Sequence, residues 1–258
     1  MDILPQMLSH HYSLGFRHFY LMDNDSVDGT LEYIKDFAPK GAKVTVLVDK
    51  GLAYEQSART NKMARMAYED GLSWIFPLDA DEFIKDIKDI EEYVAQLPHK
   101  NGIIKINWFD YPFLKKHFEN KESDSPFYKT LTERLEKPNL DGNGKRAVFY
   151  NPDMKFNTGN HLVKGAKKKW ELLVLDDSLN LAHYRFRSAK QFKLKIKTHM
   201  KSVSLVGKGG YDQLQVEYEK ALREDKESDF WLEIIERHLT QFKSLNLVED
   251  PLPYRGEA

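Results

Sequence analysis

The sequence predicts an α/β fold in which a mixed, mainly parallel sheet is flanked by helices. Short apolar strands alternate with amphipathic helices over the first 80 or so residues, a pattern typical of parallel strands joined by right-handed crossovers. The strand expected over residues 16–22 is apolar or aromatic on both of its faces, as in a strand that helices cover on both sides. These two observations define the fold class.

The elements follow from local patterns. Residues 2–14 carry apolar side chains at helical spacing, with Asp2 placed as the N-cap and Gly15 ending the helix. Beyond the first strand we expect helices over 27–37, 57–69, 87–97, 188–200 and 230–245, and strands over 43–48, 74–78, 102–108, 147–150, 172–175 and 179–184.

The domain organisation is expected to be simple. Residues 109–144 are rich in Lys, Asn, Asp, Gly and Pro, which indicates a long loop or lid. No internal repeat interrupts the chain. We expect one domain over residues 1–210 and a helical extension over residues 211–258 that packs on the same domain.

Composition excludes several classes of protein. The absence of cysteine excludes disulfides and thiolate metal sites. No apolar run reaches the roughly 20 residues of a membrane span, and the first residues do not resemble a signal peptide. Aromatic residues make up 12% of the 258, too many for a disordered chain. We therefore expect a cytoplasmic globular protein.

The net charge of −1 conceals an asymmetry. Residues 141–213 hold 15 Lys and Arg against 6 Asp and Glu, a balance of +9, whereas residues 1–84 hold 8 against 13, a balance of −5. The basic block favours a phosphate-bearing partner or an anionic membrane, so peripheral association with the inner face of the membrane is an open alternative. No nucleic-acid-binding module is recognisable, and we expect no nucleic-acid partner.

A pair of carboxylates, Asp79 and Asp81, directly follows the apolar segment 74–78. Ligands bind beyond the carboxyl ends of strands in open α/β sheets, so this is where a site is expected. Two such carboxylates suit Mg²⁺ or Mn²⁺, which often share their coordination with phosphate. The alternative is a solvated pair that caps the next helix.

A second polar segment, Asp23–Thr30, follows the first strand. Its carboxylates and amides could hold the base and ribose of a nucleotide. The alternative is a capped turn before the helix over 27–37, with Asp25 or Ser26 as the N-cap.

Taken in order, these segments resemble the family 2-type glycosyltransferases. Residues 74–83 read W-x-x-x-x-D-x-D-E-F, similar to one variant of that family's metal-binding segment. A later H-Y-R-x-R-S stretch resembles the C-terminal signature of the same subgroup. The segments that carry the resemblance are Leu4–His11, Gly15–Tyr20, Asp23–Thr30, Trp74–Phe83, Gly159–His161 and His183–Ser188, with Lys195 beyond them.

The resemblance implies the GT-A fold, a nucleotide-diphosphate sugar as donor and Mn²⁺ or Mg²⁺ as cofactor. Asp79 and Asp81 match the pair that holds the metal against the diphosphate, and His183 matches a C-terminal metal-binding histidine. The matching donor-binding positions are Asp23, Asn24, Tyr54, Gln56, Arg59 and Asn61, with Arg185, Arg187 and Lys195 near the phosphates. The role of His161 stays open between the acceptor site and a structural turn.

The resemblance also implies a strand immediately before the helix over 2–14, which this chain lacks. We expect the slot beside strand 16–22 to be left open unless another segment or a partner chain fills it. A version extended by roughly ten residues should then be more stable.

Sugar transfer with inversion needs a carboxylate base that takes the proton of the acceptor hydroxyl. The candidates between the carboxylate pair and the C-terminal histidine are Asp110, Glu133 and Asp141. We favour Glu133, because Arg134 follows it and its surroundings resemble an acceptor lid. Asp81 serves catalysis through the metal, and the acceptor is a glycan or a lipid-linked hydroxyl.

Two other functions remain open. A nucleotidyltransferase uses a similar sheet and metal carboxylates but needs a Gly-rich phosphate loop, which is not visible here. A degenerate sugar-nucleotide or carbohydrate-binding domain without turnover is the non-enzymatic alternative.

Overall fold

The computed structural model describes residues 1–49, 56–97, 102–119, 125–138, 144–165, 172–173, 179–204, 211–242 and 245–256. The chain divides into two compact units. The first comprises Met1–Phe109, Lys137–His183 and Pro253–Ala258, and the second comprises Asp110–Glu136 and Tyr184–Leu252. This division differs from a boundary at residue 210, because the segment after residue 184 packs with the C-terminal helices.

The first unit contains most of the strands. Its helices are α1 (Leu4–Ser13), α2 (Thr30–Asp36), α3 (Gln56–Glu69) and α4 (Ile90–Ala95), with a 3-10 turn η1 (Thr158–Asn160). Its strands are β1 (His18–Asp23), β2 (Lys43–Val48), β3 (Trp74–Ile75), β4 (Glu82–Lys85), β5 (Ile103–Asp110), β7 (Lys145–Phe149), β8 (Lys155–Phe156), β9 (Val163–Lys164), β10 (Leu172–Leu173) and β11 (Asn180–His183).

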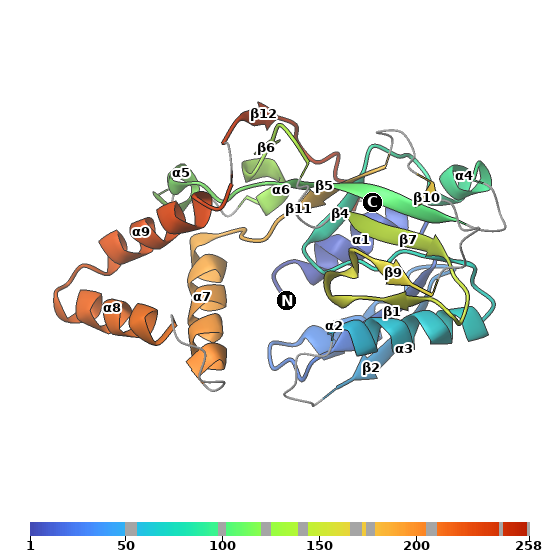
Figure 1. Ribbon diagram of the computed structural model, residues 1–258, viewed down its shortest axis with the longest axis horizontal. Helices are drawn as coiled ribbons and strands as arrows, with labels where there is room; N and C mark the ends of the chain where they lie inside the picture. The colour runs from blue at the N-terminus through green and yellow to red at the C-terminus, as the bar shows by residue number, and fades with distance from the viewer. Residues whose placement is uncertain are drawn as a thin grey trace. The chain divides into compact units, whose positions relative to one another are not determined.

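Two sheets position the site. The larger one has the order β3-β7-β5-β11-β4, with β10 paired to β5. The smaller one is the parallel pair β1–β2, on which α2 and α3 pack (Figure 1). The predicted mixed α/β architecture is confirmed. Among the pairings whose direction the structure gives, β1–β2 and β10–β5 are parallel, whereas β3–β7, β5–β7 and β4–β11 are antiparallel.

The core of the larger sheet is aliphatic. Ile84, Ile104, Ala147 and Leu181 are each fully buried and come from four different strands. Phe16 and Trp74 pack against this cluster from its margin. Burial of such side chains, at roughly 1.5–3 kcal/mol each, is what holds strands from distant parts of the sequence together.

Helix α1 is tied to β4 by two buried histidines. Its N-cap is Ile3 and not Asp2 as predicted, and no side chain caps the helix. The Nε2 of His10 lies 2.7 Å from the Ile84 carbonyl oxygen, and the Ile84 N–H donates to His11 Nε2 at 3.2 Å. Burial lowers the pKa of His10 to about 4. Burial and the neighbouring His10 lower the pKa of His11 to about 3. Both rings are therefore neutral at physiological pH.

Helix α2 starts later than predicted. Its N-cap is Gly29, in the left-handed conformation at φ +82°, and not Asp25 or Ser26. A left-handed backbone suits glycine, which has no Cβ to collide with the chain. Asp28 Oδ1 accepts hydrogen bonds from the N–H and hydroxyl of Thr30, and so supports the first turn.

The second unit contains α5 (Lys115–Glu119), α6 (Phe127–Thr130), β6 (Glu133–Leu135), α7 (Ala189–Ser204), α8 (Tyr211–Arg223), α9 (Glu227–Leu239) and β12 (Leu247–Glu249). The segment predicted as a loop over 109–144 thus contains two short helices and a strand, and β6 pairs antiparallel with β12. Phe192 and Trp231 are fully buried and pack edge to face. In the described part of the chain no helix is long and apolar enough to span a membrane.

Candidate functional site

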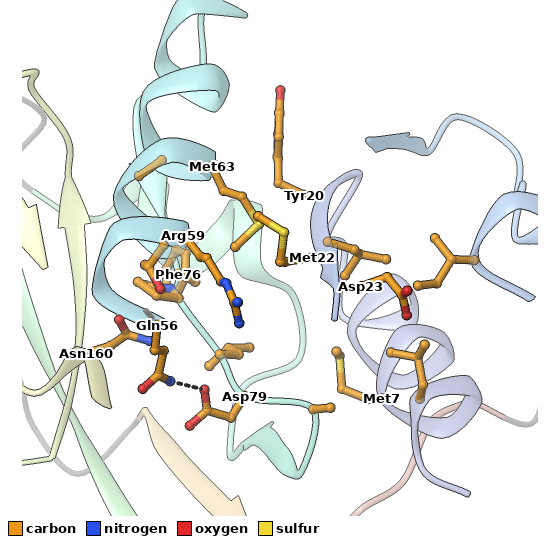
Figure 2. Close-up of a pocket in the computed structure, with 18 of the residues that line it drawn as sticks. Met7, Tyr20, Met22, Asp23, Gln56, Arg59, Met63, Phe76, Asp79 and Asn160 are labelled. Atoms are coloured by element: carbon orange, nitrogen blue, oxygen red, sulfur yellow. Dashed lines mark hydrogen bonds between the residues drawn. The ribbon is translucent and has the colours of Figure 1, made fainter. Parts of the chain in front are cut away.

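A cavity of about 700 Å³ lies in the first unit and is lined by residues of β1, α1, α3 and the segment around β3. Figure 2 shows side chains from α1 and α3 entering it from opposite sides. Most of its wall is apolar. The polar lining residues include Asp23, Asn24, Gln56, Arg59, Asp79 and Asp81, all of which were predicted as site residues.

Asp23 ends β1 and is only 3% exposed. Its Oδ2 accepts the N–H of Ser26 at 3.1 Å, which fixes the carboxylate against the turn. Its Oδ1 is buried without a hydrogen-bond partner among the described residues. A buried acceptor without a donor costs about 1–3 kcal/mol, so this oxygen is suited to accept a hydrogen bond from a ligand in the cavity.

Asp79 occupies a different environment at the end of the β3 segment. Its Oδ1 accepts from Gln56 Nε2 at 2.9 Å and its Oδ2 from Lys145 Nζ at 2.9 Å. Lys145 is 1% exposed and also lies 2.8 Å from Glu82 Oε1, while Glu82 Oε2 accepts the backbone N–H of Asp79 at 2.9 Å. One buried ammonium therefore serves two carboxylates.

The electrostatics of this cluster follow from burial. Burial raises the pKa of Glu82 to about 7, against the opposing effect of Lys145. Burial alone would lower the pKa of Lys145. The negative charges of the neighbouring Glu82 and Asp79 outweigh the effect of burial, so the pKa of Lys145 is raised. With all three groups ionised, two negative charges face one positive charge, and the cluster keeps a net attraction for cations.

Asp81 lies beside His183, with its Oδ1 3.8 Å from the imidazole Nε2. The antiparallel register of β4 and β11 places His183 opposite Glu82, one residue beyond Asp81. Trp108 packs edge-on against His183 with ring centroids 4.6 Å apart and stacks on His161 at 5.4 Å, and Lys145 Nζ lies 5.8 Å from the centre of its ring. The Trp108 indole therefore contacts both histidine rings and restricts their orientation.

His161 has a structural partner. Its Nδ1 lies 3.0 Å from the Gly144 carbonyl oxygen, and burial lowers the pKa of its imidazole. The preceding Gly159 has φ +79°, and a Cβ there would lie 2.6 Å from the His161 ring. Glycine is therefore required at this position for the ring to keep its place.

A divalent cation is compatible with part of this donor set. No three carboxylate or imidazole side chains converge in a metal-binding cluster within the described ranges. The pair of Asp81 and His183 offers one oxygen and one nitrogen donor, a combination that suits Mn²⁺ better than Mg²⁺. Asp79 accepts one hydrogen bond on each carboxylate oxygen, from Gln56 and Lys145, and each oxygen keeps a further lone pair for a cation.

The remaining residues that were predicted to bind the sugar donor do not all line the cavity. Arg59 lines the cavity, and its Nε donates to Asp49 Oδ2 at 2.6 Å. Asn61 does not line it, because its amide exchanges hydrogen bonds with the backbone of Phe156 at 2.8 and 2.9 Å. Tyr54 and the candidate base Asp141 lie outside the described residues.

The second unit holds the other predicted residues. Glu133 in β6 pairs with Lys116, and Lys195 Nζ donates to the Arg185 carbonyl oxygen at 3.2 Å. Arg187 donates to the Tyr184 carbonyl oxygen at 2.9 Å. Their suggested parts in catalysis and phosphate binding stay predictions.

Two site residues, Lys145 and Trp108, were missed from the sequence. Lys145 was counted only as part of the basic block, and Trp108 as a strand residue. Asn160 lines the cavity, is 2% exposed and adopts φ +59°. A Gly-Asn dipeptide is a signal for such a left-handed turn, and Asn160 belongs to the segment Gly159–His161 that carried the resemblance.

Ligands bind beyond the carboxyl ends of the strands in open α/β sheets, and the carboxylates of this cavity stand at that position. The family model "Glycosyl transferase family 2" matches residues 12–154, more than half of the chain, and the chain belongs to that family. A comparison with curated proteins finds no match. Membership establishes the GT-A fold and glycosyltransferase activity in the broad sense, in a family that generally uses nucleotide-sugar donors and divalent metals.

Proposed function

We propose that this protein transfers a sugar from a nucleotide-diphosphate sugar to a hydroxyl acceptor, with the nucleotide bound at the polar end of the cavity. One observation carries the proposal: Asp23, with its unpartnered buried oxygen, and the pair of Asp79 and Asp81 line the same cavity. Family membership supplies the reaction class. The sugar, the nucleotide and the acceptor are left open by these residues.

Asp23 is proposed to receive the base or ribose. Its Oδ1 accepts a hydrogen bond from an N–H or O–H donor, and the turn holds the carboxylate through Ser26. Asn24 lines the cavity beside it. Arg59 reaches the cavity from α3, where Figure 2 shows its guanidinium pointing inward, and supplies positive charge for the phosphates.

Asp81 and His183 are proposed to hold the divalent cation, and Asp79 to approach it on donor binding. A bound cation supplies charge stabilisation for the departing diphosphate. Lys145 holds the Asp79 carboxylate in position and offsets its charge until the donor arrives. Arg185 and Lys195 are proposed as further phosphate-binding groups.

The proton of the acceptor hydroxyl is proposed to pass to Glu133 in an inverting reaction. Its carboxylate pairs with Lys116, which must release one oxygen for that role. A glycan or a lipid-linked hydroxyl is the proposed acceptor, reached from the cytoplasmic side by peripheral association with the membrane.

Hydrolysis of a panel of nucleotide sugars without acceptor, with and without Mn²⁺, tests the proposal. Asp81→Asn should reduce metal-dependent hydrolysis at least a hundredfold and leave the melting temperature unchanged, because the amide keeps the shape of the side chain. Asp36→Asn, at an exposed position on α2, is the matched control and should retain full activity.

The same panel separates the alternatives. Pyrophosphate release from nucleoside triphosphates would indicate a nucleotidyltransferase, and nucleotide binding without hydrolysis would indicate a degenerate binding domain. If an Asp79/Asp81 double alanine variant still bound nucleoside diphosphate in a metal-dependent way, the assignment of the metal site would be wrong.

A further inference from the structure

Asn160, in the wall of the cavity, carries two separate costs to stability. It is 2% exposed, and its Oδ1 is buried without a hydrogen-bond partner among the described residues. Its backbone lies in the left-handed region at φ +59°, where a residue with a Cβ is strained. Buried polar atoms without a partner are rare in folded proteins, and strained backbones gather at functional sites. Both features favour a ligand-binding role for this side chain.

The turn itself does not need asparagine at this position. Glycine adopts a left-handed backbone without steric cost, and the preceding Gly159 does so at φ +79°. Asparagine can also occupy this region when its side chain bonds to the nearby backbone. The Asn160 oxygen makes no such bond within the described part of the chain. That oxygen therefore gives the turn nothing that a second glycine would lack.

The turn that carries Asn160 is held in place by its neighbours. The Leu162 N–H donates to Asn157 Oδ1 at 2.8 Å, and the Asn157 N–H donates to the Leu162 carbonyl oxygen at 3.1 Å. The Gly159 N–H donates to Gln56 Oε1 at 3.0 Å. These bonds fix the position of Asn160 before a ligand arrives, so that binding requires little reorganisation of the protein.

Gln56 connects this turn to Asp79. Its Oε1 accepts from Gly159, while its Nε2 donates to Asp79 Oδ1 at 2.9 Å. Figure 2 shows Asn160 and Gln56 on one side of the cavity and Asp23 on the other. Under the proposed function the base or ribose lies at Asp23 and the diphosphate at Asp79. The part of the donor that reaches Asn160 is then the sugar beyond the diphosphate.

We propose that Asn160 determines which sugar is transferred, by accepting a hydrogen bond from one free hydroxyl of the donor sugar on its Oδ1; this inference rests on the proposed function. An acceptor oxygen requires an O–H or N–H donor, which an ionised carboxylate or phosphate group cannot supply. A hydroxyl fits better than an acetamido N–H, because Asn160 is almost fully enclosed and the acetyl group needs additional space. The substrate class is therefore a nucleotide-diphosphate hexose with a free hydroxyl at this position.

The affinities of matched ligands for the wild type and for Asn160→Gly test the proposal. Isothermal titration calorimetry is carried out with UDP-, GDP- and dTDP-hexoses and with the three nucleoside diphosphates alone. At least one nucleotide hexose should bind about tenfold more weakly to the variant, the loss expected for one hydrogen bond. The corresponding nucleoside diphosphate, which lacks the sugar, should bind to both proteins alike.

The melting temperature separates this role from a structural one. Asn160→Gly allows the left-handed backbone and removes an amide oxygen that has no partner, so the melting temperature should not fall. Asn157→Gly is the matched control in the same turn, because it removes the acceptor of the Leu162 N–H. We expect that variant to melt at a lower temperature than the wild type.

Deoxy analogues of the hexose that binds most tightly identify the hydroxyl. Removal of one particular hydroxyl should weaken binding to the wild type about tenfold and change binding to Asn160→Gly much less, because the partner of that hydroxyl is already absent. A hydroxyl that acts elsewhere in the cavity would cost the same affinity in both proteins.

An equal loss of affinity for the nucleoside diphosphate alone would place the base at Asn160 and overturn the proposal. Dependence on Asn160 for N-acetylhexosamine donors but not for hexoses would also contradict it. So would weaker binding of a methyl hexoside with unchanged binding of every nucleotide hexose, because the hydroxyl would then belong to the acceptor. Nucleotide hexoses that bind equally to both proteins would overturn this inference alone, whereas a panel without any binding would overturn the proposed function as well.

Discussion

The two carboxylates at the strand ends of the cavity differ in burial and in hydrogen bonding, because Asp23 is 3% exposed and the side chain of Asp79 is 40% exposed. At the end of β1, Asp23 has one oxygen with no donor among the residues that the structure describes. At the end of β3, both oxygens of Asp79 already have donors, from Gln56 and Lys145. Asp23 Oδ1 can accept a first hydrogen bond from a ligand, whereas Asp79 would bind a ligand beside two contacts that it already makes.

The difference shows that two carboxylates at similar positions after a strand can favour different kinds of ligand. An unpartnered acceptor at Asp23 favours a neutral hydrogen-bond donor such as a hydroxyl or a ring N–H. A cluster of Asp79, Glu82 and Lys145 with excess negative charge favours a cation instead. Two variants test the comparison, and an acid titration probes a separate buried pair; they follow from the largest expected effect to the smallest.

Lys145→Met should lower the free energy of unfolding by about 3–5 kcal/mol, because it leaves Glu82 and Asp79 without their buried counter-charge. Urea denaturation at pH 8 measures this loss. The control is Lys43→Met, which breaks an ion pair with Asp70 whose side chains are 54% and 39% exposed, and should cost under about 1 kcal/mol. Equal losses in the two variants would show that the cluster has no special role.

Acid should destabilise the protein through His10 and His11, outside both acidic ends. Each folded-state pKa lies below the unfolded value of 6.5, at about 4 and about 3. Stability is therefore fully present above pH 6.5 and is lost as the pH falls toward 4. For His10 alone the loss is about 3 kcal/mol. Urea titrations from pH 7 to 4 measure it, and a His10→Phe variant with an unchanged pH dependence would contradict the assignment.

Asp23→Asn should reduce the affinity for a nucleoside diphosphate about tenfold and leave the fold intact. The amide oxygen can still accept from Ser26, while its NH₂ group replaces the free acceptor in the cavity. Isothermal titration calorimetry gives the affinity. The matched control is Asp25→Asn at an exposed position, and a similar loss there would mean that net charge rather than Asp23 controls binding.

The sequence was most informative where the pattern is local. The helix now seen as α1 and the strand β2 were predicted close to their observed bounds, because apolar spacing and turn residues define them. Asp23, Asp79 and Asp81 were identified by their position after strands. All three line the cavity.

What was missed depends on contacts between distant residues. The strand β4 begins with a buried Glu82, whose burial becomes intelligible only with Lys145 beside it. The partner of Asp79 lies 66 positions further along the chain, and no spacing rule links the two. α8 was predicted only as part of a helical extension over residues 211–258, without bounds of its own.

The separation of β1 and β2 from the larger sheet affects how the protein opens. An isolated two-stranded sheet is marginally stable, so we expect this pair and α2 to unfold locally before the six-stranded sheet does. Asp23 belongs to that cooperative unit, whose backbone amides we expect to exchange with solvent faster than those of the larger sheet. A nucleotide that binds Asp23 must therefore select the folded state of this unit. The observed binding free energy is then reduced by the free energy needed to populate that state.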